Sequence, residues 1–263
     1  MKKLLKITFL FLIILSCARQ QQSDGKFVSL SPSITKQIID LSSENLLSGI
    51  TSFCPSIEDV NIVGTLVNPN IERILLLKPK KVLMSLEDSA VQKTEALKKS
   101  GIDIHIFSKN KNFEDICKNY LELAKILKAE STAKEKLKQY KLNFESLKST
   151  GSEPAVFLVS TNPLIAVSGK SYIGDILRNS GYKNEFEDLS IPYPVVSMEA
   201  LLKSSPKFIF VMEKADFDYL KRHSAMSMFS SRIYYTGNEN PPYYTLFDYL
   251  ETMKILNSFR VQE

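Results

Sequence analysis

The central segment of the chain, residues 112–150, reads NFEDICKNYLELAKILKAESTAKEKLKQYKLNFESLKST. It contains no proline or glycine, and its apolar residues recur every three or four positions, which is the spacing of amphipathic helices. Residues 132–135, TAKE, fit a capping box, so we expect one helix over residues 113–127 and a second over residues 133–147. The second is rich in lysine and glutamate with a narrow apolar stripe, which favours a solvent-exposed strut between two lobes.

Short apolar, β-branched runs alternate with helical patterns on both sides of this segment. Strands are expected at residues 27–30, 46–50, 81–86, 102–107, 155–159, 208–212 and 233–235. Further helices are expected at residues 33–41, 89–99, 172–179 and 246–259. This alternation predicts an α/β protein with mainly parallel sheets in two lobes, joined by a single long helix. The predicted divisions are an N-terminal lobe at 27–130, the inter-lobe helix at 131–150 and a C-terminal lobe at 151–263.

One pattern occurs once in each half of the chain. Glu72 precedes Pro79 by seven positions, Glu199 precedes Pro206 by seven, and each proline is followed by a predicted strand. Each glutamate is therefore expected in the first turn of a short helix that leads into a strand. A carboxylate there stabilises the helix through its dipole and needs no other role. The matching placement also predicts equivalent corners of a pseudo-symmetric molecule.

The first sixteen residues have the features of a secretory signal. A cationic start is followed by an apolar run that is too short to span a bilayer. Ser16 and Cys17 then supply the small residue and the cysteine at which a lipoprotein signal peptidase cuts. We predict a signal peptide at residues 1–16, a lipid on Cys17, and a polar tether over residues 17–26. An ordinary secretory signal with an incidental cysteine is the alternative.

Charge and cysteine content narrow the class of protein. The net charge is +5 at pH 7, but lysines alternate with glutamates along the expected helices. This pattern is typical of a solvated helix surface and predicts no nucleic-acid partner. If Cys17 is lipidated, Cys54 and Cys117 remain; they could form one disulfide, but two free thiols are expected because nothing in the sequence demands the bond.

Two collinear blocks resemble the family of periplasmic binding proteins for iron chelates and cobalamin. The first block comprises VSLSPSIT at 28–35, GIT at 49–51, VG at 63–64, NPNIE at 68–72 and LKP at 77–79. The other block comprises NP at 162–163, SGK at 168–170, IPYP at 191–194, VSME at 196–199 and SP at 205–206. In order and spacing, this C-terminal block is most similar to the cobalamin-binding members of the family.

The resemblance implies an exported lipoprotein of the periplasm or cell surface that serves an ABC importer. Its ligand would lie in a cleft between the lobes, and Glu72 and Glu199 would dock onto arginines of the importer's membrane permease dimer. The implied ligand is cobalamin or a related bulky metal chelate, with a ferric siderophore or haem as the alternative. No resident cofactor or protein-bound metal is expected.

Candidate ligand residues follow the carboxyl ends of the expected strands, where open α/β sheets bind ligands. Ser31, Pro32 and Ser33 follow the first strand, although a helix-capping role for either serine is the favoured interpretation. Phe53 follows the strand at 46–50, and Asn162 opens the C-terminal block.

Two aromatic candidates follow proline residues, which restrict the backbone. Tyr193 lies between two prolines and could form a rigid apolar wall for a flat macrocycle. Tyr243, next to Tyr244, follows a pair of prolines and could do the same, although surface packing explains it equally well.

Signals for catalysis are incomplete. Residues 168–171, SGKS, resemble the end of a phosphate-binding loop, but Leu164 stands where the first glycine belongs. No Gly-x-Ser-x-Gly elbow occurs, and His105 and His223 share no metal-ligand spacing. We therefore predict a protein that is not an enzyme, with a lipoprotein enzyme or adhesin on the same frame as the rival.

Overall fold

The computed structural model describes residues 26–86, 91–237 and 244–260. Cys17 and Tyr243 lie outside the described residues, as does the expected signal peptide. Within the described part of the chain, no helix is both long and apolar enough to cross a bilayer.

The N-terminal lobe contains a parallel sheet whose inner strands are buried and whose edge strands are more exposed. Its strands are β1 (Phe27–Ser29), β2 (Leu47–Ile50), β3 (Asn61–Ile62), β4 (Lys81–Ser85) and β5 (Ile104–Phe107), in the order β3-β2-β1-β4-β5. Its helices are α2 (Pro32–Asp40), the 3₁₀ turn η1 (Glu44–Leu46), α3 (Ile71–Leu76), α4 (Val91–Lys99) and α5 (Phe113–Leu127). Strands with helices on both faces need apolar residues on both sides, which fits the apolar run Val82–Met84 of β4.

The C-terminal lobe contains a mixed sheet. Its strands are β6 (Glu153–Thr161), β7 (Leu164–Ala166), β8 (Tyr182–Asn184), β9 (Phe208–Val211) and β10 (Ile233–Tyr235). The main order is β10-β9-β6-β7, and β8 pairs with the start of β6; only the β6–β7 pair is antiparallel among the described pairs. The helices are α7 (Tyr172–Asn179), α8 (Met198–Ser204), α9 (Lys214–Arg222), the 3₁₀ segment η2 (Ser224–Arg232) and α10 (Leu246–Arg260).

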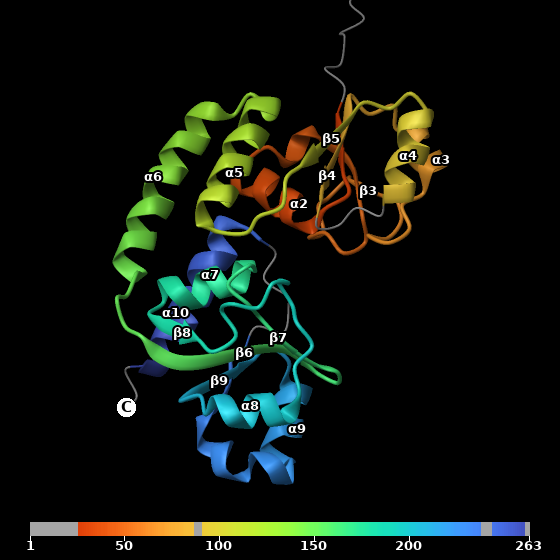
Figure 1. Cartoon of the computed structure of the whole chain (residues 1–263). Helices are drawn as coiled ribbons and strands as arrows, with labels where there is room; N and C mark the ends of the chain where they lie inside the picture. The colour runs from red at the N-terminus through yellow and green to blue at the C-terminus, as the bar shows by residue number, and fades with distance from the viewer. Residues whose placement is uncertain (1–25, 87–90, 238–243, 261–263) are drawn as a thin grey trace, which may run out of the picture.

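Helix α6 (Glu130–Leu147) runs along one side of both lobes (Figure 1). It begins three residues before the expected helix, so the capping-box prediction is wrong. Lys128 adopts a left-handed conformation (φ 59°), and the amide of Ala129 donates to the carbonyl of Ala124 at 2.8 Å. This turn closes α5 and reverses the chain at once, so that α6 starts after Ala129 without a side-chain cap.

The two lobes share one hydrophobic core. The cluster includes Leu83 and Phe107 from the first sheet and Phe157 and Phe208 from the second, and α5, α6 and α10 bridge them. Two smaller clusters cover the outer faces, one beneath α3 and α4 and the other beneath α8 and α9. A continuous core of this kind resists independent movement of the lobes.

Gly174, in the first turn of α7, packs against the chain that leads into its own helix. A Cβ at this position would lie 2.0 Å from the backbone oxygen of Ser168. We expect Gly174→Ala to destabilise the protein by about 1–3 kcal/mol, because backbone must move to make room. Urea unfolding measures the change. A variant as stable as the parent would contradict this packing, since helix propensity alone favours alanine.

Candidate ligand site and docking corners

The first turn of α2 lies at the carboxyl end of β1. Ser31 occupies the N-cap position but makes no side-chain cap; its Oγ lies 2.8 Å from the Oγ of Ser33. The capping role favoured for these serines is therefore wrong for Ser31, because its hydroxyl is engaged with Ser33. Ser31, Pro32 and Ser33 are all buried at the carboxyl end of β1, so they would lie at the bottom of a cleft there.

A network of hydroxyl groups holds the loop after β2 against α2. The Oγ1 of Thr35 lies 2.8 Å from Ser29 Oγ and 3.2 Å from Cys54 Sγ. Thr51 Oγ1 lies 3.2 Å from the same sulfur. Phe53, next to this anchored cysteine, is 59% exposed. Thus the loop is fixed while its aromatic ring is available to a ligand.

Cys54 and Cys117 are both free thiols, as the sequence predicted. Cys54 is half-buried, whereas Cys117 lies in the core beneath α5. Burial raises the pKa of the Cys117 thiol to about 12, with a smaller contribution from the charge of Glu114. Cys117 therefore stays protonated and is protected from thiol chemistry near neutral pH.

The aromatic wall of the C-terminal lobe consists of Tyr193 and Tyr244. Their hydroxyl oxygens lie 3.1 Å apart, and the ring of Tyr244 lies 4.7 Å from that of buried Tyr172. The backbone around Tyr193 is fixed as the flanking prolines predicted: the carbonyls of Pro192 and Pro194 accept hydrogen bonds of 3.0 Å from Ser168 and Ala166. Tyr193 remains 36% exposed on this fixed loop.

Residues 168–171, the sequence that resembles part of a phosphate loop, hold this wall in place. Ser168 donates its hydroxyl to the carbonyl of Ile191 at 2.7 Å. Ser171 caps α7 by accepting from the amide of Gly174 at 3.0 Å. The motif therefore secures the tyrosine loop and the start of α7.

An ion pair joins the two halves of the candidate site. Lys36 Nζ on α2 lies 3.0 Å from Asp248 Oδ1 on α10. Lys36 belongs to α2, whereas Asp248 lies in the first turn of α10, which begins two residues after Tyr244. The pair thus joins α2 to the start of the helix that follows the aromatic wall in sequence. Asn162 is not brought into this contact: it lies in the exposed turn between β6 and β7.

Glu72 and Glu199 occupy matching positions in the local structure of the two lobes, as the repeat predicted. They lie in the first turns of α3 and α8, whose N-caps are Asn70 and Ser197. In both lobes the residue directly before the proline is left-handed, Lys78 in one and Ser205 in the other. Both glutamates are exposed, and neither bonds to another residue in the described ranges.

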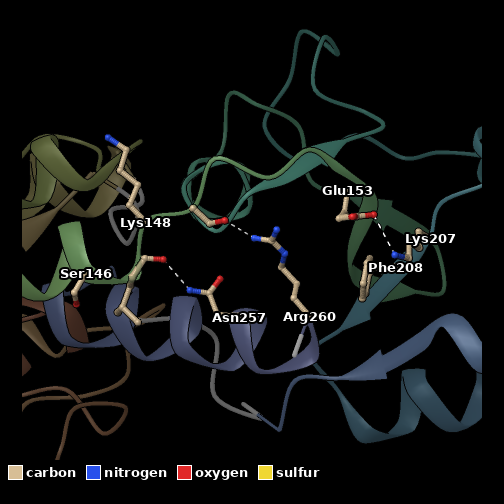
Figure 2. Close-up of a pocket in the computed structure, with 9 residues that line it drawn as sticks. Ser146, Lys148, Glu153, Lys207, Phe208, Asn257 and Arg260 are labelled. Carbon is tan, nitrogen blue, oxygen red and sulfur yellow. Dashed lines mark hydrogen bonds and ion pairs between the residues drawn. The ribbon is translucent and has the colours of Figure 1, made fainter. Parts of the chain in front are cut away.

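A cavity of about 530 Å³ lies elsewhere, where the end of α6 meets β6 and α10 (Figure 2). Asn257 donates to the carbonyl of Leu147 at 2.8 Å, and Arg260 donates to the carbonyl of Ser180 at 3.1 Å. Lys207 and Glu153 pair at 3.3 Å at the amino ends of their strands. The contacts of Asn257 and Arg260 attach α10 to the end of α6 and to the turn after α7. The cavity lies at the amino ends of the strands, whereas open α/β sheets bind their ligands at the carboxyl ends.

No group of three or more His, Cys, Asp or Glu side chains that could hold a metal ion occurs among residues 26–86, 91–237 and 244–260. The fold and the candidate site define a two-lobed α/β binding protein with a fixed aromatic wall at the lobe junction. Residues 29–231 match the model of the periplasmic binding protein family, and the chain belongs to this family.

Individual relatives agree with this assignment. The vitamin B12-binding protein of Vibrio vulnificus is 25% identical over 211 residues, which cover 78% of this chain and 77% of the relative. An ABC transporter substrate-binding protein of Listeria monocytogenes has the same fold, with a TM-score of 0.78 at 19% identity over 90% of this chain and 98% of its own. The periplasmic haem-binding protein of Vibrio cholerae gives a TM-score of 0.78 at 16% identity, covering 90% and 99%.

Proposed function

We propose that this protein is the extracytoplasmic solute-binding lipoprotein of an ABC importer, and that it captures cobalamin or a related bulky metal chelate for the membrane permease. The observation that carries the proposal is the fixed pair Tyr193–Tyr244 at the lobe junction, just before α10, the helix whose Asp248 pairs with Lys36 of the other lobe. Aromatic rings held by backbone hydrogen bonds suit a large flat ligand, because little side-chain freedom is lost on binding.

Residues of both lobes contribute to the proposed cleft in different ways. Phe53 and Tyr193 supply exposed rings, and we include Tyr243 as a further contact, whereas Asn162, in the exposed β6–β7 turn, is left out of the proposed cleft. The buried residues Ser31, Pro32 and Ser33 shape the floor. The proposed lobes comprise residues 27–130 and 151–263 with the connecting helix at 131–150, and the ligand supplies any metal.

Haem or a ferric siderophore is the second candidate ligand. The relatives named for vitamin B12 support cobalamin, whereas the haem-binding protein of Vibrio cholerae shares the fold with a higher TM-score, 0.78, than the vitamin B12-binding protein of that organism, 0.71. An exposed tyrosine wall is chemically compatible with either macrocycle.

A competitive panel of titrations tests the function. The purified protein is titrated calorimetrically with cyanocobalamin, haemin and a ferric hydroxamate siderophore, and its melting temperature is recorded with each. We expect one of them to bind with one-to-one stoichiometry and to raise the melting temperature, because the ligand binds the folded state alone. Binding of none would overturn the assignment of ligand class.

The lipid anchor has its own test. We expect Cys17→Ser to move the protein from the membrane fraction to the soluble extracytoplasmic fraction, because the lipid on Cys17 is proposed to hold it. Fractionation with immunodetection measures this, and Cys54→Ser is the control that should remain in the membrane. A Cys17→Ser protein that is processed and still sediments with membranes would contradict the anchor.

A further inference from the structure

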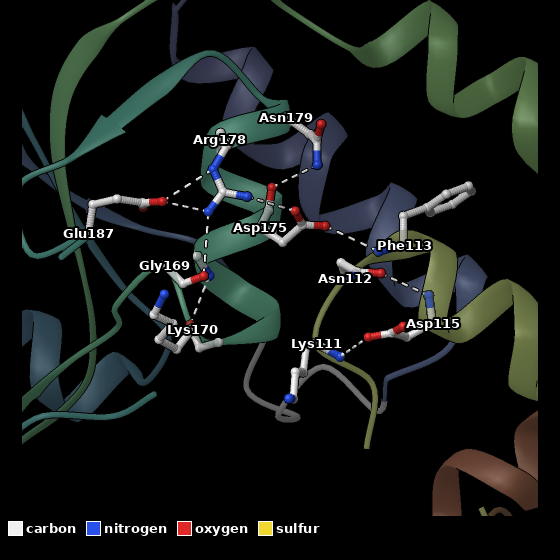
Figure 3. A network of polar contacts seen from close by, with 12 residues as sticks. Lys111, Asn112, Phe113, Asp115, Gly169, Lys170, Asp175, Arg178, Asn179 and Glu187 are labelled. Carbon is white, nitrogen blue, oxygen red and sulfur yellow. Dashed lines mark hydrogen bonds and ion pairs between the residues drawn. The ribbon is translucent and has the colours of Figure 1, made fainter. Parts of the chain in front are cut away.

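Asp175 on α7 accepts a hydrogen bond from the start of a helix that belongs to the other lobe (Figure 3). The backbone amide of Phe113, the first residue of α5, donates to its Oδ2 at 3.1 Å. The Tyr249 hydroxyl donates to the same oxygen at 2.8 Å, and Arg178 Nη1 donates to Oδ1 at 3.0 Å. Only 8% of Asp175 is exposed, so these donors supply the hydrogen bonds that water would otherwise make to the carboxylate.

The amino end of α5 is therefore capped twice, once from within and once from the C-terminal lobe. Its own N-cap, Asn112, accepts from the amide of Asp115 at 2.8 Å. The amide of Phe113 has no acceptor within its own helix, because the first helical amides lack one. A carboxylate meets this need and also interacts favourably with the helix dipole.

The contact continues through α10 to the N-terminal lobe. Tyr249, which bonds Asp175, follows Asp248, which pairs with Lys36 on α2. Burial, and then the charge of Asp175, raise the pKa of Tyr249, so its hydroxyl keeps its proton at any physiological pH. Four helices, α2, α10, α7 and α5, are thus tied by side chains across the lobe junction.

The same helix also supports the aromatic wall. Tyr172 lies three residues before Asp175 on α7, so the two share one face of the helix. The Tyr172 ring lies 4.7 Å from that of Tyr244 and 5.4 Å from that of Tyr249. Tyr244 in turn contacts Tyr193. A rotation of α7 would therefore move the wall.

We propose that Asp175 is a positioning residue that fixes the angle between the lobes and the place of the Tyr193–Tyr244 wall by capping α5 across the lobe junction. Its effect on the cleft rests on the proposed function; its effect on the lobes does not. Asparagine at this position keeps the shape of the side chain but removes its charge. Its NH₂ group would also face one of the three groups that now donate to the Asp175 carboxylate, so one of these hydrogen bonds would be lost.

The test compares Asp175→Asn with Asp216→Asn. Asp216 makes a comparable carboxylate–amide bond within the C-terminal lobe, accepting from the amide of Thr161 at the end of β6 at 3.1 Å. In ligand-free protein we expect Asp175→Asn to speed hydrogen exchange in the first turns of α5 and α7 by roughly tenfold or more. Asp216→Asn should leave both turns unchanged and loosen only the β6–β7 region.

Ligand kinetics provide another readout. We expect cyanocobalamin, or haemin if that is the chelate that binds, to leave Asp175→Asn about tenfold faster by stopped flow, with an unchanged rate from Asp216→Asn. Unchanged exchange in α5, or faster exchange with unchanged ligand release, would overturn the proposal. If the parent protein binds no chelate, the proposed function is wrong. The hydrogen-exchange comparison then still shows whether Asp175 caps α5.

A milder variant guards against loss of folding. Tyr249→Phe removes one donor and leaves the bond between Phe113 and Asp175. Exchange in the first turn of α7 should rise about threefold, with a smaller rise in α5, because the Tyr249 hydroxyl no longer donates to Asp175 or accepts from Asn179. No change in either turn would overturn the role of the network.

Discussion

Replacing Glu72 and Glu199 together with alanine is expected to abolish ligand uptake and to leave ligand affinity unchanged. Both carboxylates are exposed, and they lie in the first turns of α3 and α8, helices that cover the smaller apolar clusters of the two lobes. Neither has an ion-pair partner in the described part of the chain, so each is available to a partner protein.

The size of the effect follows from the symmetry of the proposed partner. A permease dimer offers two equivalent sockets, and one glutamate would enter each. Arginine meets a carboxylate with two parallel hydrogen bonds, and such pairs contribute more once docking excludes water. Loss of both should therefore prevent productive docking, whereas loss of one should leave partial transport.

Uptake of labelled ligand by cells, and stimulation of the importer's ATPase in liposomes, measure the effect. The matched control is Glu135→Ala with Glu145→Ala, which removes two exposed glutamates from α6. Normal transport by the Glu72/Glu199 double variant would return both residues to the role of helix stabilisers.

Tyr193→Ala is expected to weaken ligand binding roughly five- to hundredfold, or about 1–3 kcal/mol. The substitution removes an exposed ring from a loop that backbone hydrogen bonds hold in place, so the loop should not move to fill the gap. Tyr193→Phe separates the contribution of the ring from that of the hydroxyl, because it keeps the ring and removes the hydroxyl that contacts Tyr244.

Calorimetry with the chelate that binds the parent measures both variants. Tyr193→Phe should retain most of the affinity. Tyr219→Ala is the control, since this residue of α9 is also exposed and lies outside the proposed cleft. Unchanged affinity in Tyr193→Ala would remove the residue from the site.

Much of the fold was predictable because its elements are long or strongly periodic. The bounds of α5 and α7 agree with the sequence prediction, as does β10. Strands β3, β7 and β8 were missed because two or three residues carry no recognisable period, and β10, equally short, was found only through its β-branched and aromatic composition. The start of α6 was placed too late because the TAKE sequence was taken as its beginning. In the structure α5 ends at the left-handed Lys128, and α6 begins two residues later, at Glu130.

The candidate site was predictable only where its geometry is local. Flanking prolines indicated the fixed position of Tyr193, and the Glu-to-Pro spacing indicated the two corners. The Tyr193–Tyr244 contact joins residues 51 positions apart, and the Lys36–Asp248 pair joins residues 212 apart. Neither leaves a periodic signal, because tertiary packing alone brings them together.

Native mass spectrometry of the protein purified from its own cells, with elemental analysis of the same sample, is the decisive test of capture of a metal chelate. We predict one bound metal chelate per chain, which is released on unfolding and rebinds to the refolded protein. Cobalt would identify a corrinoid, and iron would identify haem or a siderophore complex. Recovery of the protein with a small metal-free metabolite as its sole stoichiometric ligand would contradict the proposed function.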